Sequence, residues 1–199
     1  MNAASRTDEE LMQSFQTGDA DAFRVLFEKY KTPIFAFLFR RCGNRDTASD
    51  LAQDVFARLV KSADSFRHQS KFSTWIYTIA RNAVVDNARK ARHRNHASLE
   101  DSRDKDGPRL GDRLAGDSPE PDRSVISQQL QEDLVEAIST LPEDQREVFL
   151  LREYHGMPFQ EISEVVGAKI GTVKSRMRYA LETLRRDLDS YENYARTLP

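Results

Sequence analysis

The first half of the chain carries apolar residues at helical rather than strand spacing. Over 23–38 they recur at steps of three and four residues, the period of one buried helix face. Pro33 lies within this stretch, so we expect it to kink or divide the helix, and Gly43 is expected to end it. Similar spacing over 51–60 and 72–84 predicts two further helices. No strand-like alternation competes with this pattern anywhere along the chain.

The last third of the chain predicts four shorter helices. The first carries apolar residues over 130–141, and the second begins near Pro142, whose fixed φ suits a first helical turn. A third covers about 158–166, and Gly167 allows a tight turn before a fourth that starts near Ile170. A short helix, a glycine turn and a longer helix in this order are typical of a helix-turn-helix.

Residues 94–126 interrupt both patterns. They are rich in Asp, Ser, Gly and Pro and contain no Phe, Tyr or Trp, so we expect a flexible linker. The sequence therefore predicts an all-α protein with two small helical domains, over 1–93 and 127–190. A tail over 191–199 follows, to which we assign no role.

Charge is distributed unevenly along the chain. The 199 residues have a net charge of −2, yet Lys and Arg greatly outnumber acids over 81–94 and again over 169–186. Acidic residues gather near the N-terminus and over 132–147. Two basic stretches on an otherwise acidic chain favour two contacts with nucleic acid over indiscriminate binding.

Composition argues against several other classes of protein. Apolar runs are too short for a transmembrane span, and the polar, acidic N-terminus lacks a signal-peptide core, so we expect a cytoplasmic protein. The single Cys42 excludes an internal disulfide and a multi-cysteine metal site. The four histidines show no metal-ligand spacing. We therefore expect no cofactor and no metal.

The last predicted helix has the amphipathic layout of a DNA recognition helix. Outward residues near its N-terminal end can reach base edges, and flanking cations can reach phosphates. Thr172 and the free N–H groups of the first turn can hold a phosphate. A solvated surface helix would share this charge pattern, but the preceding helix and glycine turn favour DNA contact. The side assigned inward carries Val173, Met177, Ala180, Leu181 and Leu184.

The third helix of the first domain places aromatic rings beside a basic stretch. Rings that stack on bases and cations that bind phosphates suit single-stranded DNA. Asp86 either contacts DNA or positions a neighbouring arginine, and Ser70 or Ser73 is expected to cap the helix. The core face carries Phe72, Trp75 and Ile79, whereas Tyr77, Asn82 and Arg89 face away and are the candidates for contact.

Three stretches of the chain also carry a family resemblance. They are DLAQDVF over 50–56, FRHQSKFSTWIYTIARNAVVD over 66–86, and Leu141-Pro142 followed by GTVKSR over 171–176. In this order they resemble the polymerase-clamp-binding helix, the promoter-melting segment and the fourth domain of extracytoplasmic-function (ECF) sigma factors of bacterial RNA polymerase. The resemblance covers both predicted domains.

The resemblance implies a sigma factor that binds core RNA polymerase, directs it to promoters and helps to open the minus-ten region. The loop 62–71 would cradle a flipped base, and an anti-sigma factor is the expected inhibitor. No catalytic residue is implied, because the polymerase performs the chemistry. The implied residues are Asp50, Gln53, Asp54 and Phe56 for polymerase; Phe66, Arg67, Ser70, Lys71, Tyr77, Arg81, Asn82, Asp86, Arg89 and Lys90 for minus-ten DNA; and Thr172, Lys174, Ser175, Arg176, Arg178 and Tyr179 for minus-thirty-five DNA.

Three residues depart from the family pattern. Lys169 stands where a capping serine is frequent; a lysine cannot cap a helix N-terminus, so Thr172 is expected to take over and start the regular helix later. The small Ala168 replaces a larger aliphatic residue at the turn. Tyr179 replaces a frequent arginine, which leaves the base contact there open.

Three alternatives fit parts of the sequence. A helix-turn-helix regulator that binds operators alone leaves the N-terminal resemblance unexplained. A sigma-like decoy that sequesters a regulator does not need the basic residues Lys174, Arg176 and Arg178. An enzyme is least favoured, because no nucleophile motif appears.

Overall fold

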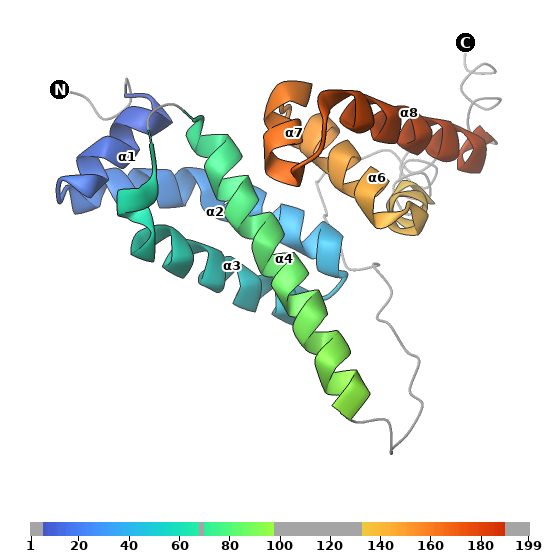
Figure 1. Ribbon diagram of the computed structural model, residues 1–199, viewed down its shortest axis with the longest axis horizontal. Helices are drawn as coiled ribbons and strands as arrows, with labels where there is room; N and C mark the ends of the chain where they lie inside the picture. The colour runs from blue at the N-terminus through green and yellow to red at the C-terminus, as the bar shows by residue number, and fades with distance from the viewer. Residues whose placement is uncertain (1–5, 68–69, 98–132, 190–199) are drawn as a thin grey trace, which may run out of the picture.

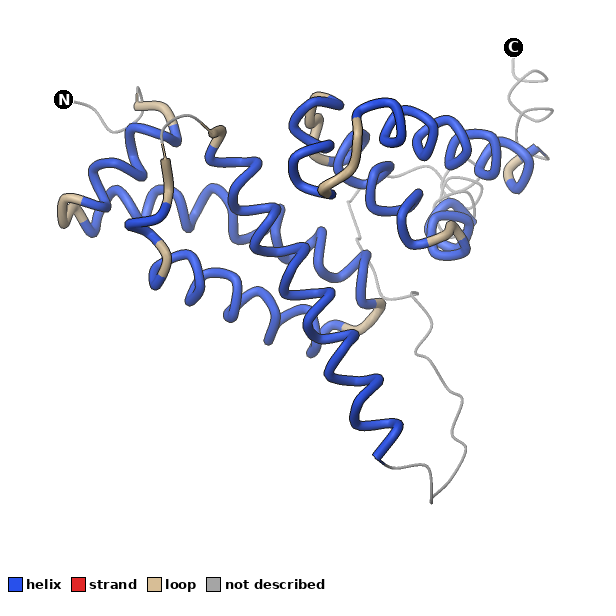
Figure 2. Tube along the Cα trace, viewed as in Figure 1, coloured by secondary structure: helices blue, strands red, loops and turns tan. Residues whose placement is uncertain are grey.

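The computed structural model describes residues 6–67, 70–97 and 133–189, and every regular element in these ranges is helical (Figure 1, Figure 2). The predicted all-α class is therefore confirmed. The predicted tail and most of the predicted linker, from residue 98, lie outside these ranges. The elements are α1 (Asp8–Gln16), α2 (Ala20–Cys42), α3 (Arg45–Lys61), the 3₁₀ turn η2 (Ala63–Ser65), α4 (Phe72–Ala97), a helix over 133–140, α6 (Glu143–Phe149), the π-helical turn η3 (Leu150–Tyr154), α7 (Phe159–Val166) and α8 (Ile170–Asp187).

Helices α1 to α4 form the N-terminal domain, in which α4 packs against both α2 and α3 (Figure 1). Its largest fully buried side chains include Phe37 of α2 and Phe72 of α4. The sequence predicts that Pro33 kinks or divides its helix, and the second of these expectations is wrong, because α2 is one helix with Pro33 inside. A proline removes one backbone hydrogen bond from a helix, and the fully buried Ile34 and Phe37 just beyond it anchor the helix to the core.

Helix α1 is an element that the apolar pattern did not predict. It begins with a capping box, in which the Thr7 side chain accepts from the Glu10 N–H and the Glu10 carboxylate accepts from the Thr7 N–H. Leu11 and Met12 then bury against the rest of the domain. The signal was present as a threonine three residues before a glutamate and an apolar pair, but it is shorter than the window in which a helical period can be recognised.

The C-terminal domain, residues 133–189, contains the predicted helix-turn-helix. Gly167 ends α7 with a left-handed backbone (φ +65°), a conformation that residues with a Cβ rarely adopt. α8 starts at Ile170, with Lys169 in the cap position and no side-chain cap. The expectation that Thr172 starts the helix later is therefore wrong.

The described parts of the two domains pack against each other. α7 and the turn before it lie along the first half of α4, whereas the far end of α4 projects beyond the other helices (Figure 1). α4 continues to Ala97, so its last turn overlaps the start of the predicted linker. None of the described helices has the length and apolar content that a membrane crossing needs.

Candidate nucleic-acid interfaces

The outward face of α8 is largely free, as its predicted role requires. The side chains of Lys174, Ser175, Arg178 and Tyr179 are exposed. The inward assignment holds for Val173, Met177, Ala180 and Leu184, which are all buried, but Leu181 is 48% exposed and its inward assignment is wrong. Leu181 directly follows the buried Ala180, and the helix turns about 100° per residue, which rotates it out of the contact with α6 and α7.

Two polar contacts restrict the first half of α8. Arg176 is half-buried and forms an ion pair with Asp144 of α6, so its guanidinium is already engaged within the domain. The Thr172 N–H donates to the Lys169 carbonyl at 2.8 Å, so this amide is not free for a phosphate, although the Thr172 side chain is exposed. Lys174 and Arg178 are therefore the exposed cations on this part of the helix.

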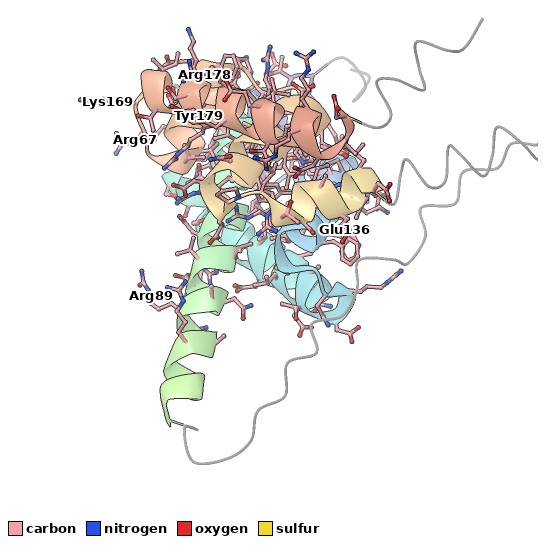
Figure 3. All side chains as sticks on the ribbon, turned by 90° about the vertical axis from the view of Figure 1, so that its right-hand side faces the viewer. Arg67, Arg89, Glu136, Lys169, Arg178 and Tyr179 are labelled. Atoms are coloured by element: carbon pink, nitrogen blue, oxygen red, sulfur yellow. The ribbon has the colours of Figure 1, made fainter. Side chains whose placement is uncertain are left out.

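Tyr179 lies beside a cation on the same helix. The Arg178 guanidinium carbon is 4.8 Å from the Tyr179 ring centroid, and Arg178 Nε is 3.7 Å from Glu182 Oε1. A stacked guanidinium retains hydrogen-bond donors at its edge. Arg178 and Tyr179 thus place a cation beside an aromatic ring on the exposed side of α8 (Figure 3).

The second basic surface follows α4 and the loop before it. Arg67, Ser70, Lys71, Asn82, Arg89 and Lys90 are all exposed. Arg67, Arg89 and Lys169 project from the same side of the molecule, although they come from the two different domains (Figure 3). A shallow groove adjoins Asn82 and is lined by Arg58, Lys61, Ser62, Ile79 and Asn82.

Asp86 positions an arginine, which was one of its two predicted roles. Its Oδ2 accepts from Arg58 Nη1 at 2.9 Å, and Arg58 Nη2 lies 2.8 Å from Asp54 Oδ2. The hydrogen bonds to Asp86 and then to Asp54 raise the pKa of Arg58, which stays charged. Sequence reasoning did not single out Arg58, the residue that links a predicted polymerase contact to a predicted DNA contact.

Two aromatic site residues are buried. Phe66 packs with ring centroids 5.1 Å from Trp75 and 5.9 Å from Phe72. Phe56 packs edge-on against Phe27 at 4.8 Å. Both rings therefore pack in the core beneath the predicted contact surfaces, Phe66 beneath the loop and Phe56 beneath the exposed face of α3. Of the other residues implied for polymerase binding, all on α3, Asp50 and Gln53 are exposed and Asp54 is half-buried.

Tyr77 does not face solvent, and this expectation is wrong. Only 3% of the residue is exposed, because the C-terminal domain covers it. Its hydroxyl lies 2.7 Å from His155 Nδ1, and its ring packs edge-on against Phe37. Burial raises the pKa of Tyr77, and burial together with Arg40 lowers the pKa of His155 to about 4, so both side chains are neutral. The helical wheel of α4 could not reveal this contact, because its partner lies 78 residues away.

Arg81 is also engaged by the C-terminal domain. Its Nε lies 3.2 Å from Glu147 Oε1 and donates to Oε2 at 3.3 Å. Arg41 Nη2 lies 3.6 Å from the same Glu147 Oε1 and 2.8 Å from Glu143 Oε1. Two arginines of the N-terminal domain thus neutralise one buried glutamate of α6. None of these three contacts could be found from local sequence patterns.

Within the described ranges, no group of three or more His, Cys, Asp and Glu side chains is placed to hold an ion. Cys42 is half-buried, and burial raises the pKa of its thiol.

Comparison with known proteins assigns both domains. The family model for sigma-70 region 2 matches residues 26–94, and that for sigma-70 region 4 matches residues 131–184. The chain is 32% identical to the ECF RNA polymerase sigma factor SigW of Bacillus subtilis over 89% of this chain and 94% of that protein. The chain belongs to the ECF sigma factors. This family member is also 31% identical to the ECF RNA polymerase sigma-E factor of Escherichia coli K12, over 89% of this chain and 92% of that one.

Solved structures share the fold. The sigma factor RpoE from Bartonella quintana, solved in complex with the anti-sigma factor NepR, matches with a TM-score of 0.69 and 24% identity over 84% of this chain and 96% of that chain. CnrH, solved with the cytosolic domain of CnrY, matches with a TM-score of 0.65 and 21% identity over 95% and 99%. The predicted arrangement of two sigma-like helical domains is therefore confirmed. This ECF sigma factor acts with RNA polymerase in transcription initiation.

Proposed function

We propose that this sigma factor binds core RNA polymerase through α3, holds the opened minus-ten strand with α4 and reads minus-thirty-five duplex with α8. The observation that carries the proposal is the pair of exposed basic surfaces, one on each matched sigma region. The chain performs no chemistry itself, because the polymerase supplies it. It acts in the cytoplasm, where the polymerase and the chromosome are.

The polymerase contact involves the exposed side of α3. Asp50 and Gln53 lie three residues apart, so they share one helix face, and Asp54 adds a second carboxylate beside it. Acidic groups at this position suit a basic partner surface. Phe56 contributes by packing beneath this face.

The DNA contacts divide between the two domains. At the minus-ten element, Arg67, Ser70, Lys71, Asn82, Arg89 and Lys90 are accessible, and Asp86 contributes by positioning Arg58. At the minus-thirty-five element, Lys174, Ser175, Arg178 and Tyr179 are accessible, with Thr172 at the start of the helix.

Contacts of DNA with Tyr77 and Arg81 require rearrangement of the domains, whereas the proposed role of Phe66 does not. Tyr77 and Arg81 lie under the C-terminal domain, so we propose that the domains separate before these two residues meet the opened strand. Phe66 acts from within the aromatic cluster that supports the loop. An anti-sigma factor is the proposed regulator, as for the Bartonella quintana sigma factor in its complex.

Transcription in vitro from genomic DNA, with core polymerase and this protein, tests the function. We expect transcripts that start at discrete sites with shared minus-ten and minus-thirty-five sequences upstream. Tight binding of the isolated protein to a specific duplex, with no contribution from polymerase, would instead establish an operator-binding regulator. Capture of a regulator without any directed transcription would establish a decoy.

Two pairs of variants test duplex recognition by α8 and polymerase binding by α3 separately. Lys174→Ala with Arg178→Ala should lower promoter-directed transcription about tenfold or more, whereas Arg24→Ala, an equally exposed arginine on α2, should leave it unchanged. Asp50→Lys should weaken binding to core polymerase, whereas Glu136→Lys, on the helix over 133–140 (Figure 3), should not.

A further inference from the structure

Helix α1 contacts the start of the minus-ten loop and the first residue of the helix that follows it. We define this loop as residues 62–71, of which 62–67 and 70–71 are described. Near the loop's start, Gln16 Nε2 donates to the Ala63 carbonyl at 2.8 Å and to the Phe66 carbonyl at 3.0 Å. Directly after its other end, Glu9 Oε1 accepts from the N–H of Phe72, the first residue of α4, at 3.0 Å. α1 precedes the segment that matches the sigma region 2 model, 26–94.

The two contacts come from one face of α1. Glu9 and Gln16 are seven residues apart, so they lie two turns apart on nearly the same side, separated by about 10 Å along the axis. A single rigid helix thereby sets the distance between the start of the loop and the start of α4. The Glu9 carboxylate also lies at the positive end of the α4 dipole, where negative charge is stabilising. This is the capping position that the sequence had suggested for Ser70 or Ser73.

α1 is itself held firmly by α2. The Tyr30 hydroxyl donates to Asp8 Oδ2 at 2.6 Å, and Lys29 Nζ lies 2.7 Å from Asp8 Oδ1. Met12 is fully buried, and Leu11 nearly so. Because α1 is fixed to the body of the domain, its two polar contacts transmit that fixed position to the loop.

The loop ends also carry the groups that the proposed function needs. Phe66 packs on Phe72 and Trp75, and the exposed Arg67 follows Phe66 directly. A small shift of the Phe66 carbonyl would therefore move the Arg67 guanidinium and the beginning of α4 relative to each other. By analogy with reacting groups, for which a misplacement of about 1 Å can cost a factor of about 100 in rate, such a shift should slow capture of an unpaired base.

We propose that Glu9 and Gln16 are positioning residues for promoter opening: they hold the two ends of the minus-ten loop at the separation that captures the unpaired strand, without touching DNA themselves. The inference rests on the proposed function of the loop. It predicts that loss of either contact slows strand opening while polymerase binding and duplex recognition stay intact.

The test uses the complete protein with core polymerase and promoter DNA carrying 2-aminopurine in the minus-ten element. Gln16→Met keeps the side-chain length and removes both donors, and Glu9→Met removes the acceptor. Each should slow the rise in fluorescence about tenfold, as expected for the loss of one or two partly buried hydrogen bonds. Glu9→Gln retains an acceptor oxygen and should restore most of the rate, and Gln13→Met, on an exposed position of the same helix, should match the unaltered protein.

Binding to core polymerase and to duplex minus-thirty-five DNA is measured on the same proteins. Unchanged opening rates in Gln16→Met and Glu9→Met would overturn the inference. Equal losses in opening and in polymerase binding would overturn it as well, because they would indicate a general loss of fold. If the unaltered protein opens no promoter with polymerase, the proposed function itself fails, and this outcome is distinct from either of the others.

Discussion

Arg41 of α2 and Glu147 of α6 form a buried ion pair between the two domains, with Nη2 and Oε1 3.6 Å apart and side chains only 2% and 3% exposed. Arg81 approaches the same carboxylate from α4. Burying charges is costly unless they are paired, so each partner depends on the others. The cluster couples the position of the C-terminal domain to two arginines, one of which is a predicted minus-ten contact.

Glu147→Gln should therefore open the molecule. The substitution leaves two arginines facing a neutral amide, and removal of one partner of a buried pair costs about 3 kcal/mol or more. We expect the radius of gyration from small-angle scattering to increase while the helix content from circular dichroism stays constant. Glu153→Gln, an exposed glutamate on η3, is the control. An unchanged radius of gyration would show that the cluster does not hold the domains together.

The contact between Tyr77 and His155 predicts a dependence on pH. In the packed arrangement burial lowers the pKa of His155 to about 4, whereas an exposed histidine has a value near 6.5. The separated form therefore binds the proton more tightly, so the packed form is fully favoured above pH 6.5 and loses stability as the pH falls toward 4. Between pH 7.5 and 5 the population ratio should shift toward separation by up to about 30-fold. Scattering across this range measures it, and a His155→Gln variant should lose the dependence.

A pair of glycine substitutions tests the turn of the helix-turn-helix. Gly167→Ala forces a Cβ into a left-handed backbone and should destabilise the C-terminal domain by about 1 kcal/mol, although no atom lies within 4 Å of the new Cβ. Gly171→Ala, in the first turn of α8 and also without a neighbour, should leave stability unchanged or raise it slightly. Urea unfolding followed by circular dichroism compares the two. Equal effects would contradict the backbone explanation.

The uncapped start of α8 offers a gain in stability. Lys169 already has the extended backbone of a cap residue but no side-chain bond to the first turn. Lys169→Ser supplies an acceptor for those N–H groups and should stabilise the domain by about 1 kcal/mol. Lys169→Ala separates this gain from the removal of a positive charge at the positive end of the helix dipole. Thermal unfolding should rank the serine variant above the alanine variant; the reverse order would exclude capping as the cause.

Local periodicity determined the helices and much of the recognition surface. The apolar steps along α2, α3 and α4 and the glycine turn before α8 are properties of neighbouring residues, which the helical period alone can align. The exposed faces with Lys174 and Arg178 and with Asn82 and Arg89 followed from the same rule. The prediction succeeded for these residues because no other segment within the described ranges covers them, although it failed for the inward assignment of Leu181 and for the start of α8.

Tertiary structure decided which of these side chains are accessible. Tyr77 pointed outward on its own helix, yet His155 covers it, and Arg81 meets Glu147, because a helix face that is polar within one domain becomes an interface with the other. Pro33 stays within a continuous α2 because packing of the residues around it outweighs the hydrogen bond it removes. Glu9, rather than Ser70 or Ser73, accepts from the first amide of α4 because it is brought there from 63 residues away. Local spacing along one chain segment carries no information about such distances, so only the packed structure could determine them.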